Sequence, residues 1–263
     1  MPDMPAYFER IGATRFRATS AVGGAWDPDE QHVAPPMGLI AHAIEQDHAS
    51  RRSDRFHLAR VSFDILGTLP IDAVEIDVRV LRGGRTIELV EATLSHDQRP
   101  AIIARAWLMQ TTDTTEIAGS ALPRIPSREE FEPFAAREGW LGEFVTTVEV
   151  HRHQHEPGRG WVWVRPGIPL LEHEAISPTA RLLGVVDIAN GMTPRARPDE
   201  VFFPNLDLTA HLFREPRGEW IGFDTTVSFG ERGIGLTDVV LHDDEGAIGT
   251  VQQILTVRPR AAG

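Results

Sequence analysis

The chain has 263 residues, of which 41% are hydrophobic and 24% are charged, as is typical of a folded soluble protein. Its 26 Lys and Arg residues against 38 Asp and Glu residues give a formal charge of −12, which opposes binding to nucleic acid phosphates. There are no cysteines, so disulfides, thiolate metal sites and a cysteine nucleophile are all excluded.

The first half of the chain predicts a strand at 15–21, a helix at 35–48 and four strand-like runs between 57 and 109. The N-terminal sequence MPDMPAYFERIG lacks the basic and apolar segments of a secretion signal. No run approaches the roughly 20 apolar residues that a membrane-spanning helix needs. We therefore expect a cytoplasmic protein with no membrane partner.

A polar segment with three prolines, residues 112–140, predicts a linker between an N-terminal unit at 1–111 and a C-terminal unit at 141–263. The second unit begins with strand candidates at 144–152 and 161–166. A helix follows at 177–192, where Ser177 is a suitable N-cap and Pro178 fits the first turn. Four strand-like runs then extend to residue 257.

The two units repeat each other. Residues 84–109 align with 232–257 without a gap at an offset of 148, and each segment contains two strand-like runs joined by a polar turn. One continuous antiparallel barrel or sandwich is the alternative, but a helix before the strands in both halves favours duplication. The expected fold class is α+β, with one helix of each unit packed on a curved antiparallel sheet and the two sheets joined edge to edge.

Several segments resemble the double-hotdog acyl-CoA thioesterases, the family of bacterial acyl-CoA thioesterase II, which act in fatty acid metabolism. They include GGAWDPDEQHVAPPMGLIAHAIE, FPNLDLTAHLFREPRGEWI and GTVQQILTVRPR, and the similarity extends over about residues 10–259. The resemblance implies a tandem hotdog fold that mimics a hotdog dimer. It also implies an acyl-CoA substrate bound at the seam between the units, no metal or other cofactor, and assembly into a homo-oligomer, a dimer of double hotdogs.

The same resemblance implies a catalytic set of Asp, Thr and Gln that orients and activates a water. Asp187 matches the Asp on the second helix, and Gln252 in TVQQ matches the Gln on the last strand. The sequence departs from the pattern at the middle position, where FPNLD places Asn205 in place of Thr. An amide can donate and accept hydrogen bonds as a hydroxyl does, but the exchange puts the rate and the substrate class in question.

The residues around Asp187 give independent reasons to examine it. In LLGVVDIANG it is a lone carboxylate in an apolar run, and a buried carboxylate must be paired or hydrogen-bonded. On a continuous helix it would share one face with Ala180, Gly184 and Gly191, which leave room for a substrate, so Gly184 is a candidate substrate-binding residue. The alternative is an exposed Asp on the solvent side of the helix.

The internal alignment predicts one working centre. Asp187 lies over Glu45 when the helices are aligned, and at the offset of 148 Asn205 lies over His57 and Gln252 over Ala104. The first half therefore lacks a copy of the Asp, Asn and Gln set. Asp207, on the same predicted strand face as Asn205, is a further candidate.

Two other motifs have simpler explanations beside functional ones. RGGR at 82–85 is a typical hairpin turn, although Arg82 and Arg85 are also candidate contacts for CoA phosphates. HRHQHE at 151–156 places three histidines on one side of a strand, which a solvated strand end explains without a metal.

The favoured function is hydrolysis of an acyl-CoA to free acid and CoA by water that Asp187 activates. Attack by Asp187 itself to form an anhydride is the alternative mechanism. A non-catalytic acyl or acyl-CoA binding protein is the main alternative function. A hotdog hydratase or dehydratase is another, but the GDxNPxH segment of the MaoC type is missing, and so is the Gly-x-Ser-x-Gly elbow of serine hydrolases.

Overall fold

The computed structural model describes residues 6–135 and 140–260. The short stretches at 1–5, 136–139 and 261–263 lie outside this range. They belong to the start of the predicted N-terminal unit, to the predicted linker and to the end of the predicted C-terminal unit. The described residues form three α-helices: α1 (Ala34–Arg51), α2 (Pro178–Leu183) and α3 (Ala189–Met192). None of these helices combines the length and apolar character that crossing a membrane would require.

Twelve antiparallel strands form one sheet in the order β1-β2-β4-β5-β6-β3-β10-β13-β12-β11-β8-β7. Those of the first half are β1 (Phe8–Arg10), β2 (Arg15–Ala18), β3 (Phe56–Ile65), β4 (Ala73–Arg82), β5 (Ile87–His96) and β6 (Arg99–Gln110). Those of the second half are β7 (Val148–Glu156), β8 (Arg159–Pro166), β10 (Asp207–Leu212), β11 (Ile221–Phe229), β12 (Ile234–Asp243) and β13 (Gly246–Thr256). A separate pair joins β9 (Val201–Phe202) to β14 (Arg258–Pro259).

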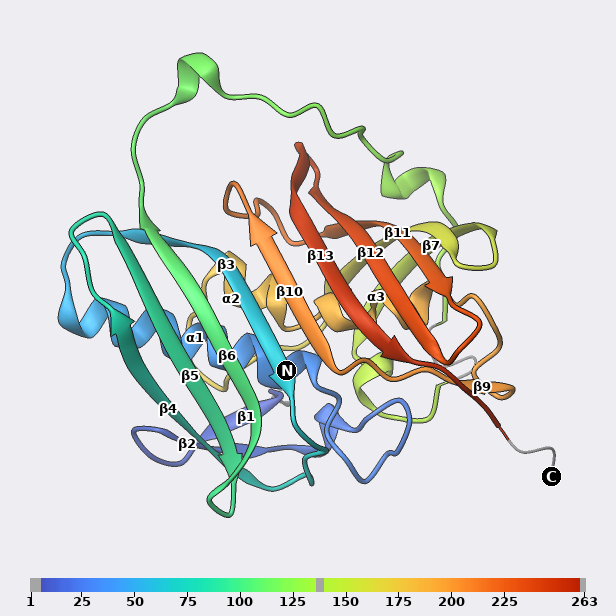
Figure 1. The fold of residues 1–263 in the computed structure, drawn as a ribbon, viewed down its shortest axis with the longest axis horizontal. Helices are drawn as coiled ribbons and strands as arrows, with labels where there is room; N and C mark the ends of the chain where they lie inside the picture. The colour runs from blue at the N-terminus through green and yellow to red at the C-terminus, as the bar shows by residue number, and fades with distance from the viewer. Residues whose placement is uncertain (1–5, 136–139, 261–263) are drawn as a thin grey trace.

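The two halves meet where β3 pairs with β10, at the centre of the sheet (Figure 1). Thr209 lies opposite Ser62, and Ala210 lies opposite Val61. The edge-to-edge joint expected from the sequence is therefore observed. Pairing the two strands satisfies backbone groups that would otherwise be exposed at two sheet edges.

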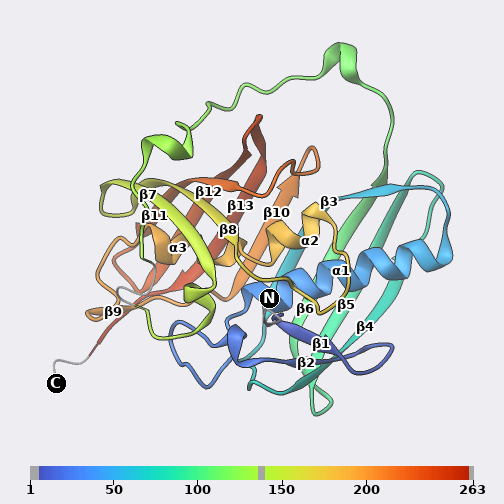
Figure 2. The same ribbon diagram turned by 180° about the vertical axis from the view of Figure 1, so that it is seen from behind.

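The helices lie on one side of the sheet, as the view from behind shows (Figure 2). The first half of α1 is buried all round, because the sheet covers one side and α2 crosses the other. At the crossing, a Cβ on Gly38 would lie 2.7 Å from the Gly184 Cα, so only glycine permits this approach. Most of the buried apolar side chains of both halves form one continuous cluster.

The prediction of one helix at 177–192 is wrong, because the structure has two short helices there. It begins as predicted, because the Ser177 hydroxyl accepts the Ala180 N–H at 2.9 Å and Pro178 occupies the first turn. It ends at Gly184, and a 3-10 turn at Val186–Ile188 precedes α3. Glycine and the β-branched residues after it have low helix propensity, which explains a break at this point.

The repeat offset of 148 is wrong by one residue. The β5–β6 turn is at Asp97 and Gln98 and the β12–β13 turn is at Asp244 and Glu245, so equivalent residues are 147 positions apart. Inward-facing residues keep the same spacing, as Ala106 and Gln253 illustrate. Because strand side chains alternate between faces, a slip of one residue places every residue of a strand on the wrong face.

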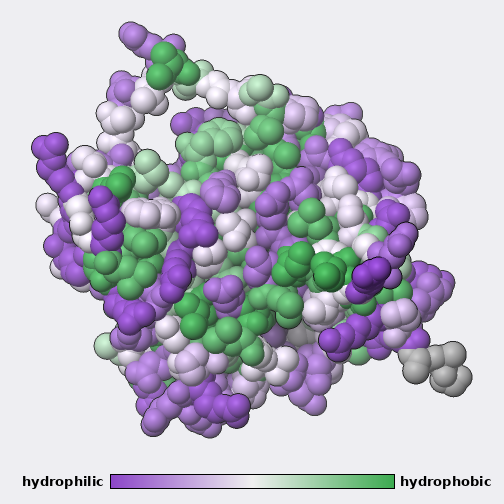
Figure 3. All heavy atoms as spheres, in the orientation of Figure 1, coloured by the Kyte–Doolittle hydropathy of each residue, from purple (hydrophilic) through white to green (hydrophobic). Residues whose placement is uncertain are grey.

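The outer face of the sheet is mixed in polarity (Figure 3). Its exposed apolar side chains include Met109 in the first half and Ile234, Leu236 and Ile254 in the second. The connection between the halves runs outside the sheet (Figures 1 and 2). Its residues from 111 to 121 are all exposed, whereas Ile125 and Phe131 are buried against Trp163.

Candidate active site

A cavity of about 350 Å³ lies at the seam between the two halves. The first half contributes loops at 24–33 and 65–68, and the second contributes 187–192 and 202–206. One wall is aromatic: the Trp26 ring lies 4.9 Å from Trp140 and 4.5 Å from Phe202, between ring centroids. A partly enclosed, mainly apolar cavity with a few polar groups is typical of a small-molecule site.

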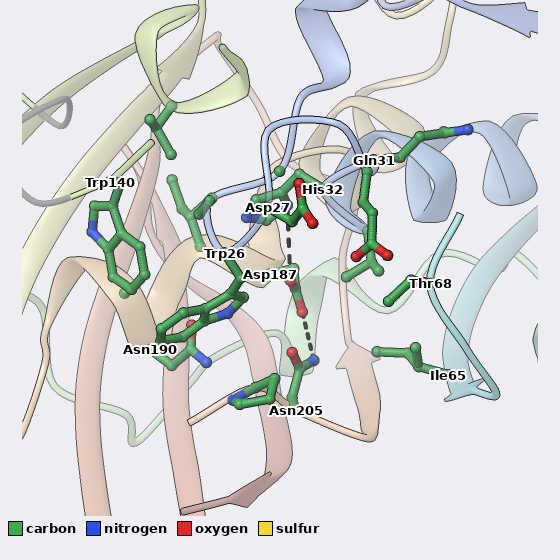
Figure 4. Close-up of a pocket in the computed structure, with 18 of the residues that line it drawn as sticks. Trp26, Asp27, Gln31, His32, Ile65, Thr68, Trp140, Asp187, Asn190 and Asn205 are labelled. Carbon is green, nitrogen blue, oxygen red and sulfur yellow. Dashed lines mark hydrogen bonds and ion pairs between the residues drawn. The ribbon is translucent and has the colours of Figure 1, made fainter. Parts of the chain in front are cut away.

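Asp187 is the buried carboxylate in the wall of this cavity, which Asp27 and Glu30 also line at more exposed positions (Figure 4). Its side chain is 5% exposed, and its Oδ1 accepts two amide hydrogen bonds, from Asn205 Nδ2 at 2.7 Å and from Gln253 Nε2 at 2.8 Å. Oδ2 forms no hydrogen bond with any described residue. One oxygen is thus fixed by the protein, and the other remains available to a water or a ligand.

Burial controls the protonation of Asp187. Loss of solvent raises its pKa to about 7, although the hydrogen bonds from Asn205 and Gln253 oppose the shift. A carboxylate with a pKa near neutrality is a stronger base than an ordinary aspartate and is still ionised in a large part of the molecules at pH 7. Such a shift in a cavity is typical of catalytic acids and bases.

His32 was not identified from the sequence, and it lies beside Asp187. Its Nδ1 is 3.9 Å from Asp187 Oδ2 and accepts the Ala34 N–H at 3.2 Å, while its ring packs on Phe144 with centroids 4.3 Å apart. Burial lowers the pKa of His32 to about 3, so the ring is neutral at neutral pH. It therefore supplies a polar but uncharged neighbour to the carboxylate.

The structure joins Asp187 to Asn205 but not to Gln252. Gln252 points to the outer face of β13, where its Nε2 donates to Asp238 Oδ1 at 2.9 Å. Gln253 points inward and is fully buried. The two neighbours are separated by the alternation of a strand, which is why adjacent glutamines in TVQQ have different environments.

Gly184 does not contact the cavity, because it packs against Gly38 of α1. Arg82 and Arg85 do not line it either. The β4–β5 turn that carries them lies at the end of the sheet where Met109 pairs with His57, whereas the cavity residue Ile65 ends β3. Ten strand residues separate the two places by about 30 Å.

The other candidates also lie elsewhere. Asp207 Oδ1 accepts the Ile254 N–H at 2.7 Å on the outer side of the joint between β10 and β13. His151 is close to the Arg128 and Phe131 carbonyl oxygens. Within 6–135 and 140–260, no group of three or more His, Cys, Asp and Glu side chains is arranged to hold a metal ion.

The first half has a related carboxylate without the amides. Glu45 of α1 accepts the Ser177 hydroxyl at 2.9 Å, and burial raises its pKa to about 7. At the observed offset of 147, the equivalents of Asn205 and Gln253 are Leu58 and Ala106, which are apolar. Among the described residues, a carboxylate held by two amides occurs only at Asp187.

Comparisons with known proteins identify the family of the chain. The sequence model of the acyl-CoA thioesterase N-terminal domain matches residues 22–109, and that of the C-terminal domain matches 121–257. The chain belongs to the acyl-CoA thioesterase family. This family membership confirms the resemblance found in the sequence, and it makes the chain an acyl-CoA thioesterase by class. A search of curated proteins found no match.

Solved structures of the same fold cover nearly the whole acyl-CoA thioesterase chain. A putative thioesterase from Novosphingobium aromaticivorans is 17% identical with a TM-score of 0.72, over 97% of this chain and 100% of that one. A putative thioesterase II from Thermobifida fusca is 17% identical with a TM-score of 0.71, over 98% and 99%. A hot dog fold protein of unknown function from Alicyclobacillus acidocaldarius is 12% identical with a TM-score of 0.76, over 96% of both chains. The predicted double hotdog fold is thereby confirmed.

Proposed function

We propose that this chain hydrolyses an acyl-CoA thioester to free acid and CoA, with Asp187 as the general base. The observation that carries the proposal is the buried Asp187 in the seam cavity, with Oδ1 held by two amides and Oδ2 without a hydrogen bond from any described residue. A water bound at Oδ2 would attack the thioester carbonyl while its proton passes to the carboxylate. The acyl group would lie against the aromatic wall that contains Trp26.

In this mechanism Gln253 replaces Gln252 as the partner of the base. Asn205 takes the place that Thr has in the family pattern, and its Nδ2 supplies a donor to Asp187 at 2.7 Å. A hydroxyl at that place would donate one hydrogen bond, and an amide can do the same. The exchange is therefore compatible with the proposed chemistry.

The direct test is release of free thiol from a panel of acyl-CoAs of different length and branching, followed with a thiol reagent. We expect steady-state turnover with at least one acyl-CoA. An acyl-CoA binding protein would instead be stabilised by the ligand and release no thiol, and that result with the whole panel would refute the proposal.

The pH dependence of kcat/KM should follow the ionisation of Asp187. Burial raises its pKa to about 7 and only the ionised form accepts a proton, so kcat/KM should rise about tenfold per pH unit below 7 and level off above it. Rates measured from pH 5 to pH 9 with one acyl-CoA would check this. The Gln252→Leu variant, altered on the outer face, should give the same profile. A rate that is constant or falls with pH would contradict the role of Asp187.

The proposal includes a cytoplasmic location, division of the chain into units at 1–111 and 141–263 by a linker at 112–140, and a dimer of double hotdogs. Exposed apolar side chains on the outer sheet face, such as Leu236 and Ile254, support self-association. Light scattering should give twice the chain mass of 29.1 kDa, and a monomer at micromolar concentration would exclude the dimer.

A further inference from the structure

We propose that Asn190 is an additional catalytic residue, whose side-chain N–H donates a hydrogen bond to the thioester carbonyl oxygen as that oxygen becomes negative. This inference rests on the proposed function and extends it, because the base and its two amides account for the water but not for the charge that develops on the substrate. Stabilising that charge is usually a large part of catalysis in acyl transfer.

Asn190 is a buried amide without a protein partner. It is 8% exposed, it lines the seam cavity, and its side chain forms no hydrogen bond with any described residue. The half-buried Asn205 and the fully buried Gln253 both donate to Asp187. A side-chain amide in the wall of a cavity without a hydrogen bond to the protein is free to bind a ligand.

The position of Asn190 suits a group that acts on the same carbonyl as Asp187. The two residues are three positions apart, in the 3-10 turn Val186–Ile188 and in α3, which follows it directly. Side chains three apart on such turns lie on one face, with Cβ atoms about 5–6 Å apart. Figure 4 shows both in the wall of the cavity. A carbonyl carbon beside a water on Asp187 Oδ2 would thus have its oxygen within reach of Asn190.

The start of α1, which directly follows the cavity residue Val33, offers no free backbone donor among residues 34–37. The Ala34 N–H donates to His32 Nδ1, and the Met37 N–H donates to the Val33 carbonyl oxygen. Pro35 and Pro36 have no N–H. The first turn of a long helix is a common source of free backbone donors, but here those groups are used or missing. The first turn of α1 therefore supplies no free backbone donor, whereas Asn190 offers a side-chain donor in the cavity wall.

The steps balance without any further reactant. The water oxygen bonds to the carbonyl carbon, its proton moves to Asp187 Oδ2, and the π electron pair of the C=O bond moves to the oxygen that accepts the Asn190 N–H. When that electron pair re-forms the C=O bond, the C–S bond breaks and the CoA thiolate takes the proton from Asp187. The products are the acid and the CoA thiol, and the amide is unchanged.

The test compares Asn190→Leu, which is close to asparagine in size, with Asn190→Ala, and neither side chain can donate a hydrogen bond. Thiol release gives kcat and KM, and binding of an S-alkyl-CoA, which has no carbonyl, reports the rest of the site. We expect kcat to fall about 10²- to 10³-fold, the usual effect of removing one such donor. KM and the Kd of the thioether should change less than about threefold, and the Gln252→Leu control should have the kcat of the unmodified protein.

Different failures have different meanings. If the unmodified protein hydrolyses acyl-CoA and either folded variant keeps its kcat, the role of Asn190 is refuted while the proposed function stands. Weaker binding of the S-alkyl-CoA with unchanged kcat would also refute it, because Asn190 would then bind another part of the substrate. If the unmodified protein releases no thiol from any acyl-CoA, both proposals are refuted.

Discussion

Replacing Asp187 with asparagine should lower kcat for acyl-CoA hydrolysis by about 10²- to 10⁴-fold, the usual contribution of a general base. The substitution preserves the shape of the side chain and an Oδ1 that can accept from Asn205 and Gln253, so the geometry of the cavity should survive. What is lost is the atom that accepts the proton of water. Thiol release under substrate saturation measures the effect.

Asp238→Asn is the matched control, because this carboxylate lies on the outer face of β12 next to Gln252. It should leave kcat unchanged. Equal activity of Asp187→Asn and the unmodified protein would exclude Asp187 as the base. Equal losses in both variants would point to a general effect on the fold.

The same substitution has an expected effect on stability. The pKa of Asp187 is about 7 in the folded protein and about 4 when the chain unfolds, so the folded state binds more protons between these values. Stability from this group is complete below about pH 4 and is lost as the pH rises to 7. The amide does not titrate, so Asp187→Asn should become more stable relative to the unmodified protein as the pH rises. Urea unfolding at pH 5 and pH 8 would show this change, and its absence would mean that Asp187 titrates normally.

Of the two adjacent glutamines, only Gln253 should affect catalysis when it is replaced by leucine. Gln253→Leu removes a donor to the ionised Asp187, a hydrogen bond of about 1.5–3 kcal/mol, so kcat/KM should fall about 10- to 100-fold near neutral pH. Because that bond lowers the pKa of Asp187, the inflection of the pH profile should also move to higher pH. Gln252→Leu removes only an outer contact with Asp238 and should leave both quantities unchanged.

The two leucine variants also distinguish the site seen in the structure, which contains Gln253, from the site expected from the sequence, which contains Gln252. The leucine variant at 253 should fold, because the side chain is fully buried and its Oε1 has no partner among the described residues. Steady-state kinetics and pH profiles of the two purified variants would decide between them. A larger loss in Gln252→Leu than in Gln253→Leu would contradict the assigned site.

Much of the fold could be predicted from local chemistry. Ser177 and Pro178 mark the start of α2, the run at 35–48 falls within α1, and the repeated hairpins predict the paired halves. These features depend on residues close in sequence. The break at Gly184 had a local signal in the glycine and the β-branched residues after it, but the close packing of Gly184 on Gly38 depends on another helix and could not be predicted.

The site was predicted only in part, for a similar reason. Asp187 stands out as a carboxylate in an apolar run, but the choice between Gln252 and Gln253 depends on which strand face points inward. The apolar residues Val251, Ile254 and Leu255 occupy both faces, so the pattern alone did not decide it. The positions of the two hairpin turns could have decided it. They give an offset of 147, which aligns Gln253 with the inward-facing Ala106.

The sequence gives only weak indications that His32 and Asn190 belong to the site. His32 reaches Asp187 across the seam, from a loop of the other half, and nothing in the local sequence links the two residues. Asn190 follows Asp187 by three positions, which places both on one face, but a small polar residue near a helix end usually has a structural role. Its lack of a partner is visible only in three dimensions.

The most direct test is one turnover of excess protein with an acyl-CoA in water enriched in ¹⁸O, followed by mass spectrometry of the acid and of the peptide that contains Asp187. Direct attack by water activated at Asp187 predicts one ¹⁸O atom in the acid and none in the peptide. Label in Asp187, as an anhydride attacked at the side-chain carbon would give, or no release of acid, would contradict the account.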